Sequence, residues 1–203
     1  MTFSFTEGHS DPTVQPVPAS VVQQVDAADT TLSNPRRAVI SIGANLGNRL
    51  ETLQGAIDAL EDTPGVRIKA VSPVYETEPW GVEPGSQPSY FNAVVVLKTT
   101  LPPSSLLERA HAVEEAFHRV REERWGARTI DVDIVAYADV VSDDPVLTLP
   151  HPRAHERAFV LAPWHDVEPE AQLPGRGPVA DLLDVVTRDG VAPRKDLELR
   201  LPE

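Results

Sequence analysis

The sequence contains no cysteine, and this absence excludes disulfide bonds, zinc–thiolate centres and cysteine nucleophiles together. Basic residues are also scarce. The chain has 18 Lys and Arg against 31 Asp and Glu, which gives a formal net charge of −13. Because binding to a nucleic-acid duplex needs a basic footprint, we expect no nucleic acid among the general partners of this protein.

Long hydrophobic runs are missing as well. No run approaches the ~20 apolar residues that a membrane-spanning helix needs, and the N-terminus lacks the basic and apolar regions of a signal peptide. We therefore expect a cytoplasmic protein that has no membrane partner. We also expect it to be a monomer. Hydrophobic residues still make up 41% of the 203 residues, which is enough to bury a sizeable core without cross-links.

The composition divides the chain into three parts. Residues 1–35 are rich in Pro, Ser, Thr, Asp and Gln and lack a sustained apolar pattern, so they are predicted to form a disordered N-terminal extension. Residues 36–175 are predicted to form the folded domain. Residues 176–203 are predicted to form a C-terminal helix and a tail.

Hydrophobic periodicity within the folded part predicts two β-α-β units. Two such units with four core strands favour an α+β fold, a ferredoxin-like α/β sandwich in which both helices pack on one face of a four-stranded antiparallel sheet. Ser105 and Glu108 fit a capping box at the start of the second helix. The predicted elements are a strand at 38–42, a helix over 50–60, strands at 66–70 and 91–97, a helix over 103–117 and a strand at 130–134.

The sharpest chemical signal is a pair of aspartates on the last of these strands. Residues two apart in a strand point the same way, so Asp131 and Asp133 share one face. Adjacent carboxylates repel each other unless a cation lies between them, and hard oxygen ligands suit Mg²⁺. The alternative is a solvent-facing acidic pair on an edge strand, because this spacing alone is common.

Four arginines precede the pair in an otherwise acidic chain: Arg119, Arg121, Arg124 and Arg128. Arginine suits the planar recognition of phosphate oxygens, so arginines and aspartates together favour a clamp for a metal-bound polyphosphate. A surface of ion pairs with neighbouring glutamates is the alternative. Glu114 is predicted on the side of the second helix opposite its apolar stripe.

Aromatic, amide and imidazole side chains add further candidates. Tyr90 and Asn92 open a strand directly after a loop rich in Pro and Gly, and an aromatic ring beside an amide suits a flat heterocycle. His151 lies between two prolines that fix its backbone, so it could contact a phosphate or a base. From its local pattern alone, Phe159 is expected in the core.

Several motifs resemble those of the 6-hydroxymethyl-7,8-dihydropterin pyrophosphokinases of the folate pathway. The matching stretches are Gly43-Ala44-Asn45-Leu46-Gly47, Tyr90-Phe91-Asn92-Ala93, Arg124-Trp125-Gly126-Ala127-Arg128-Thr129-Ile130-Asp131-Val132-Asp133 and Leu149-Pro150-His151-Pro152. The resemblance runs from about Ala38 to about Pro174 and keeps the order of every motif. Ala127 and His118 depart from the family, which usually has Pro and Gly there.

This resemblance implies transfer of the β,γ-diphosphate of ATP to the hydroxymethyl group of the pterin, with release of AMP. It also implies that Asp131 and Asp133 hold two Mg²⁺ ions. Phosphate and nucleotide contacts would come from Arg119, Arg121, Arg128, His151, Arg157 and Glu114. Pterin contacts would come from Thr77, Tyr90, Asn92 and Phe159, with Trp125 in a loop that closes over the site.

Two other classes of protein are compatible with the residues. Ferredoxin-like sandwiches often only bind small ligands, so a regulatory binding module is one alternative. A metal-dependent phosphohydrolase is the other, and it would act on ATP without a pterin. The formation of AMP only when the pterin is present would separate the three functions.

Overall fold

The structure is a computed structural model that describes residues 34–79, 87–117 and 129–202. The predicted disordered extension, residues 1–35, lies outside the described residues apart from its last two. Among the described residues, no helix is both long enough and apolar enough to cross a membrane.

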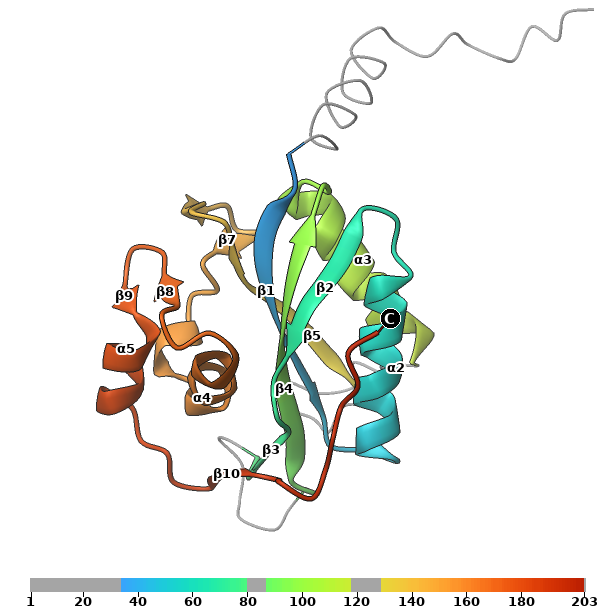
Figure 1. The fold of residues 1–203 in the computed structure, drawn as a ribbon, viewed down its shortest axis with the longest axis vertical. Helices are drawn as coiled ribbons and strands as arrows, with labels where there is room; N and C mark the ends of the chain where they lie inside the picture. Colours follow the sequence, from blue (N-terminus) through green and yellow to red (C-terminus); the bar gives the residue numbers. More distant parts are fainter. Residues whose placement is uncertain (1–33, 80–86, 118–128, 203) are drawn as a thin grey trace, which may run out of the picture.

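The four predicted core strands form one antiparallel sheet. They are β1 (Arg36–Ala44), β2 (Val66–Val71), β4 (Tyr90–Thr99) and β5 (Asp131–Tyr137). β4 and β5 flank β1, and β2 pairs with the far side of β4, which gives the order β5-β1-β4-β2. This order, with a helix after β1 and another after β4, confirms the predicted α+β ferredoxin-like sandwich (Figure 1).

Both predicted helices pack on the same face of the sheet, as Figure 1 shows on its right side. They are α2 (Arg49–Glu61) and α3 (Pro103–Ala116). The apolar stripes of both helices meet alternate residues of the strands. The fully buried side chains of this core include Ile40, Ile42, Leu53, Ile57, Leu97 and Leu106.

The predicted capping box at the start of α3 is wrong. The helix begins at Pro103 with Pro102 as its N-cap, and no side chain caps it. Ser105 therefore already lies in the first helical turn, too late in the chain to act as the cap. Proline suits the first helical position because its fixed φ fits the helix and its missing N–H would have no partner there.

Two further helices cover the opposite face of the sheet. These are α4 (Ala158–Val167) and α5 (Val179–Val185), and α5 agrees with the helix predicted within residues 176–203. Their apolar side chains form a second core against the sheet residues that point away from α2 and α3. Trp164 and Leu161 are fully buried there, beside Val39 of β1.

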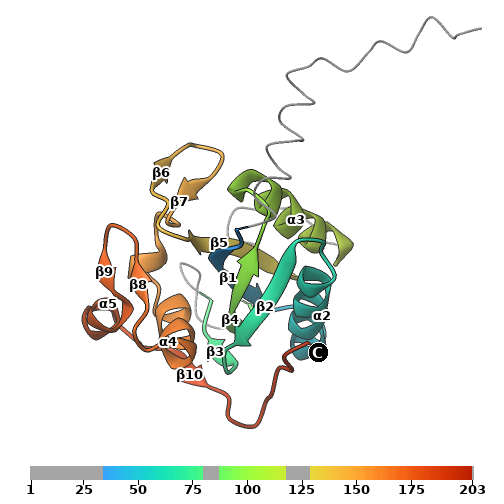
Figure 2. The ribbon, with the colours of Figure 1, turned by 45° about the horizontal axis from the view of Figure 1, so that its top comes forward.

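Short elements complete the fold (Figure 2). Two short strands extend the sheet: β3 pairs with the first residues of β4, and β10 pairs with β3. Two small hairpins, β6–β7 and β8–β9, and one turn of 3₁₀ helix follow β5, and β7 contacts β5. Their bounds are β3 (Tyr75–Thr77), β10 (Val191–Pro193), β6 (Ser142–Asp143), β7 (Thr148–Leu149), β8 (Gln172–Leu173), β9 (Gly177–Pro178) and η1 (Ala154–Glu156).

The C-terminal residues that the sequence analysis treats as a tail are packed against the domain. After β10 the chain crosses to α2, where Leu197 and Leu199 pack on the first core. The Arg200 N–H donates to Gln54 Oε1 at 2.8 Å. The C-terminal segment therefore connects the two faces of the sheet.

Candidate functional site

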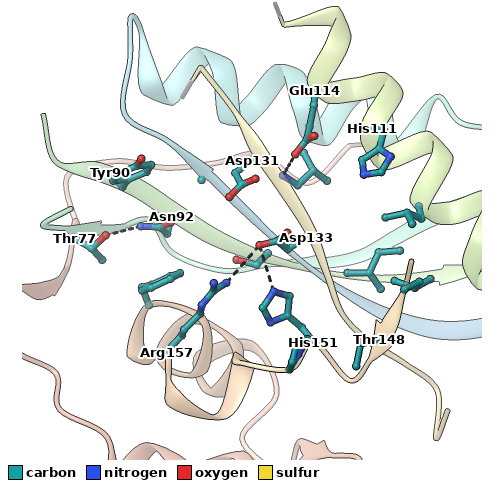
Figure 3. Close-up of a pocket in the computed structure, with 18 of the residues that line it drawn as sticks. Thr77, Tyr90, Asn92, His111, Glu114, Asp131, Asp133, Thr148, His151 and Arg157 are labelled. Atoms are coloured by element: carbon teal, nitrogen blue, oxygen red, sulfur yellow. Dashed lines mark hydrogen bonds and ion pairs between the residues drawn. The ribbon is translucent and has the colours of Figure 1, made fainter. Parts of the chain in front are cut away.

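A pocket of about 480 Å³ opens beside β5, between the start of α4 and the β6–β7 hairpin (Figure 3). Its described walls bring together candidates from five separate parts of the sequence. Those that line it are Thr77, Tyr90, Asn92, Glu114, Asp131, Asp133, His151, Arg157 and Phe159.

The acidic pair lies in the middle of this pocket, between its two ends (Figure 3). Asp131 and Asp133 are partly exposed, whereas Ile130, Val132 and Ile134 are buried on the other face of β5. The alternation predicted from the sequence is therefore confirmed. Because the hydrophobic face anchors the strand, the two carboxylates have a fixed separation and direction.

Cationic and imidazole groups face the second aspartate. Arg157 Nη1 lies 3.5 Å from Asp133 Oδ2, and His151 Nε2 lies 4.0 Å from the same oxygen. Arg157 is the N-cap residue of α4, and the His151 N–H donates to the Val135 carbonyl of β5 at 2.9 Å. Two separate elements thus converge on one carboxylate.

The imidazole of His151 is neutral at physiological pH. Burial in the pocket lowers its pKa to about 4, and the positive charge of Arg157 acts in the same direction, while Asp131 opposes both. His151 Nδ1 accepts a hydrogen bond from the Arg153 N–H at 3.1 Å. The ring proton is therefore on Nε2, the nitrogen that faces Asp133.

A buried amide and hydroxyl form one end of the pocket. Asn92 Nδ2 donates to Thr77 Oγ1 at 2.7 Å, and the two residues are 5% and 4% exposed. Gly43 lies opposite Asn92 in the β1–β4 register, and a Cβ at this position would approach Asn92 Oδ1 to 2.6 Å. Only glycine allows the amide to occupy this place between β1 and β3.

Aromatic rings complete that end. Tyr90 opens β4, as predicted, and it precedes the amide by two residues and shares its face of the strand. Phe159 lies in the first turn of α4 and is half-buried rather than wholly in the core, with the Arg157 guanidinium carbon 5.6 Å from its ring centre. The end therefore presents flat apolar surfaces around two polar side chains.

The predicted position of Glu114 is wrong. Its side chain is buried, with 3% of the residue exposed, and Oε1 accepts a hydrogen bond from the Val132 N–H at 2.9 Å. Among the described strands, β5 pairs only with β1, so its outer N–H groups need other acceptors. The sequence held a signal for this: Glu114 follows Ala110 by four residues and so continues the apolar stripe.

The opposite end of the pocket was not predicted. It is lined by Leu107 and His111 of α3 and by residues 145–148, between β6 and β7. Figure 3 shows His111 and Thr148 on the other side of the acidic pair from Thr77 and Tyr90. The signal in the sequence is weak, because Val146 and Leu147 are only two apolar residues inside a turn.

Several candidates lie outside the described residues. These are Arg119, Arg121, Arg124, Trp125 and Arg128, together with His118 and Ala127. Most of the Pro- and Gly-rich loop, residues 80–86, lies outside them too.

The acidic pair is chemically suited to Mg²⁺. In the described part of the chain, no three His, Asp or Glu side chains gather around one point, so a cage made entirely of protein ligands is absent there. Mg²⁺ usually binds through one or two carboxylates and completes its shell with water and substrate phosphates. Asp131 and Asp133 fit this donor set.

The fold and pocket define a ferredoxin-like α+β domain with a small-molecule site in which Arg157 faces an acidic pair. The chain belongs to the 7,8-dihydro-6-hydroxymethylpterin-pyrophosphokinase family, whose model matches residues 39–169.

Two relatives illustrate this similarity, and both are named 2-amino-4-hydroxy-6-hydroxymethyldihydropteridine pyrophosphokinase. The protein from Methylorubrum extorquens is 42% identical over 139 residues, which cover 68% of this chain and 87% of the relative. The protein from Mycobacterium tuberculosis is 42% identical over 186 residues, which cover 82% of this chain and 95% of the relative.

Solved structures show the same fold. A Plasmodium falciparum HPPK-DHPS triple mutant with pteroate superposes with a TM-score of 0.61 at 16% identity. The match covers 79% of this chain and 47% of the other, so this chain spans about half of that longer protein.

Proposed function

We propose that this protein transfers diphosphate from ATP to the hydroxymethyl group of 6-hydroxymethyl-7,8-dihydropterin, giving AMP and the pterin diphosphate in the synthesis of tetrahydrofolate. Family membership supports this reaction. The observation that carries the proposal is the arrangement of the pocket, in which an acidic pair lies between an aromatic, amide-lined end and a separate apolar end.

The pterin occupies the end built by Thr77, Asn92, Tyr90 and Phe159. Its flat ring matches the aromatic surfaces, and its ring nitrogens and carbonyl match the buried amide and the strand edge. The hydrogen bond between Asn92 and Thr77 fixes the amide before the ligand arrives. This preorganisation lowers the entropic cost of binding.

ATP occupies the remainder of the pocket. Its base contacts the apolar end formed by Leu107, His111 and residues 145–148, which lies beyond the acidic pair. The triphosphate then extends past Asp131 and Asp133 towards the pterin. Glu114 supports the acidic pair indirectly, because its hydrogen bond from the Val132 N–H holds the strand segment between the two aspartates.

Phosphoryl-type transfer requires mainly positioning and charge neutralisation from the protein. Arg157 supplies a positive charge beside Asp133, and the neutral His151 directs an N–H into the same space. Asp131 and Asp133 would hold two Mg²⁺ ions, which when bound neutralise phosphate charge and acidify the attacking hydroxyl.

The proposal also includes three arginines and one tryptophan, because their sequence motif resembles that of the family. We propose that Arg119, Arg121 and Arg128 contact the phosphates and that Trp125 contacts the substrates. The protein acts as a cytoplasmic monomer. The exposed large hydrophobic side chains of the described residues support this state, because only Val141 and Val146 among them are near each other in the sequence. They are Leu46, Val141, Val146, Val185 and Leu201.

One assay tests the reaction. The protein is incubated with ATP and Mg²⁺, with and without 6-hydroxymethyl-7,8-dihydropterin, and the nucleotides are separated by chromatography. The proposal expects AMP only when the pterin is present. ADP or phosphate without pterin would indicate a phosphohydrolase, and binding without any turnover would indicate a regulatory module.

A further inference from the structure

The strand that carries Thr77 depends on the C-terminal segment for half of its backbone pairing. β3 has only three residues, and β10 pairs along its outer side, with Val191 opposite Thr77. The pairing continues at both ends: the Glu78 N–H donates to the Gly190 carbonyl at 3.2 Å, and the Arg194 N–H donates to the Val74 carbonyl at 2.8 Å. We call residues 191–200 the C-terminal strap.

A side-chain cluster joins this strap to β3 and β4. Arg194 Nη1 donates to Glu76 Oε2 at 2.7 Å, and the Ser89 hydroxyl donates to Glu76 Oε1 at 2.5 Å. Arg49 Nη1 lies 3.3 Å from the same oxygen and donates to the Ser89 carbonyl at 2.7 Å. The guanidinium carbons of Arg49 and Arg194 lie 3.6 and 5.3 Å from the centre of the Phe91 ring.

The cluster residues alternate with the pocket residues along both strands. Glu76 precedes Thr77 on β3, and Phe91 lies between Tyr90 and Asn92 on β4. Because successive strand residues point to opposite faces, the cluster lies directly behind the polar end of the pocket. Glu76 and Phe91 lie opposite each other in the β3–β4 register. Their contacts therefore hold the same backbone that directs Thr77 and Asn92 into the pocket.

Charge is balanced within the cluster. The Ser89 hydroxyl lowers the pKa of Glu76 most strongly; burial opposes it, and Arg194 and Arg49 lower the pKa further. The carboxylate is thus ionised at neutral pH. Arg194 also donates from Nε and Nη2 to both oxygens of Asp196, at 2.9 and 2.7 Å, which holds its guanidinium in the plane that reaches Glu76.

We infer that Arg194, acting through Glu76, is a positioning residue for the pterin end of the pocket, and that the C-terminal strap sets the affinity for the pterin and not for the nucleotide. The inference rests on the proposed function. Its physical basis is that β3 has only three residues and would be an edge strand without β10, so the strap and its ion pairs determine how firmly Thr77 and its bond to Asn92 are held.

The test compares Arg194→Gln with Arg176→Gln, which makes the same charge change at an exposed position on the β8–β9 hairpin. Steady-state kinetics give kcat and the KM for each substrate, and calorimetric titration with 6-hydroxymethylpterin gives its Kd directly. For Arg194→Gln we expect the KM and Kd for the pterin to rise about fivefold, the usual effect of one lost hydrogen bond. We expect kcat and the KM for ATP to stay within about twofold of wild type.

Three further variants sharpen the result. Glu76→Gln should reproduce the effect, and the double variant should be no worse than either single variant, because both remove the same coupling. Arg194→Lys keeps the charge but loses the planar fork, so its pterin KM should lie between those of wild type and Arg194→Gln. Thermal melts confirm folding, and if Arg194→Gln is unfolded, Arg194→Lys provides the same comparison.

The outcomes separate this inference from the proposed function. If wild type forms AMP with the pterin but folded Arg194→Gln matches Arg176→Gln, or if its KM values for pterin and ATP rise equally, the inference alone is wrong. If wild type neither forms AMP nor binds the pterin, the proposed function fails and the inference fails with it. A selective change in pterin affinity with an active wild type supports both.

Discussion

The carboxylate of Glu114 and the N–H of Val132 form a 2.9 Å hydrogen bond that ties α3 to the strand between the two aspartates. Replacing Glu114 with Ala leaves a buried N–H without its acceptor. We expect a loss of about 1–3 kcal/mol in the free energy of unfolding. Turnover should fall as well, because the backbone that separates Asp131 from Asp133 loses its support.

Glu114→Gln is the matched control, because its amide oxygen can still accept from Val132. Chemical denaturation and AMP formation are measured for both variants. The two variants should differ clearly in stability, and equal stability would show that the hydrogen bond does not anchor β5.

The close approach of Gly43 to Asn92 gives a second prediction. A Cβ at residue 43 would come within 2.6 Å of Asn92 Oδ1, so Gly43→Ala must displace the amide and weaken its bond to Thr77. We expect pterin affinity to fall by about 5- to 150-fold, the effect of ~1–3 kcal/mol, with little change in ATP affinity. Calorimetric titration with each ligand measures both.

A double-variant cycle provides the control. In an Asn92→Ala background there is no amide to displace, so adding Gly43→Ala should cause little further loss of thermal stability or of pterin affinity. Additive losses would mean that Gly43 acts through another contact.

The acidic pair gives a third prediction. Asp131→Ala and Asp133→Ala should remain folded, because Ile130, Val132 and Ile134 hold β5 from the other face. Removing one of two adjacent carboxylates also relieves like-charge repulsion. AMP formation should fall by orders of magnitude, whereas pterin binding without nucleotide should change little.

The measurement is AMP formation against Mg²⁺ concentration, with thermal melts alongside. Chelation of the divalent cation should abolish wild-type turnover, and excess Mg²⁺ should partly rescue Asp→Asn but rescue Asp→Ala less. A folded Ala variant with near wild-type turnover would disprove the assignment of the pair.

A pH dependence of stability follows from Glu168, which links the start of β1 to the end of α4. Burial alone would raise its pKa, but hydrogen bonds from Arg37 and Trp164 outweigh this effect and hold the pKa below its ordinary value of 4.5. A carboxyl whose folded pKa is lowered stabilises the protein above its unfolded pKa and loses this contribution as pH falls through the folded pKa.

Glu168→Gln should therefore lower the Tm at pH 7, and the difference from wild type should shrink below about pH 4.5. The loss in the free energy of unfolding should not exceed about 1 kcal/mol, because Glu168 and Arg37 are both partly exposed. Glu170→Gln, at an exposed position, is the control. A Tm difference that stays constant from pH 7 to pH 3 would contradict the assignment.

The sequence alone predicted much of this molecule where the physics is local. The β-α-β order follows from hydrophobic periods of two and 3.6 residues, which depend only on neighbouring residues. The common direction of Asp131 and Asp133 has the same origin, because the alternation with Ile130, Val132 and Ile134 is a property of any half-buried strand. The family resemblance of the motifs predicted which side chains would line the pocket.

Tertiary structure decided the features that depend on segments distant in the chain. The bond from Asn92 to Thr77 requires β3 to lie beside β4, and the inward position of Glu114 requires an edge strand that lacks a hydrogen-bond acceptor. Neither the pairing of β10 with β3 nor the contact of Arg194 with Glu76, 118 residues earlier, has a local signature. Such contacts form because buried polar groups must find partners, and only the folded chain determines which partners lie within reach.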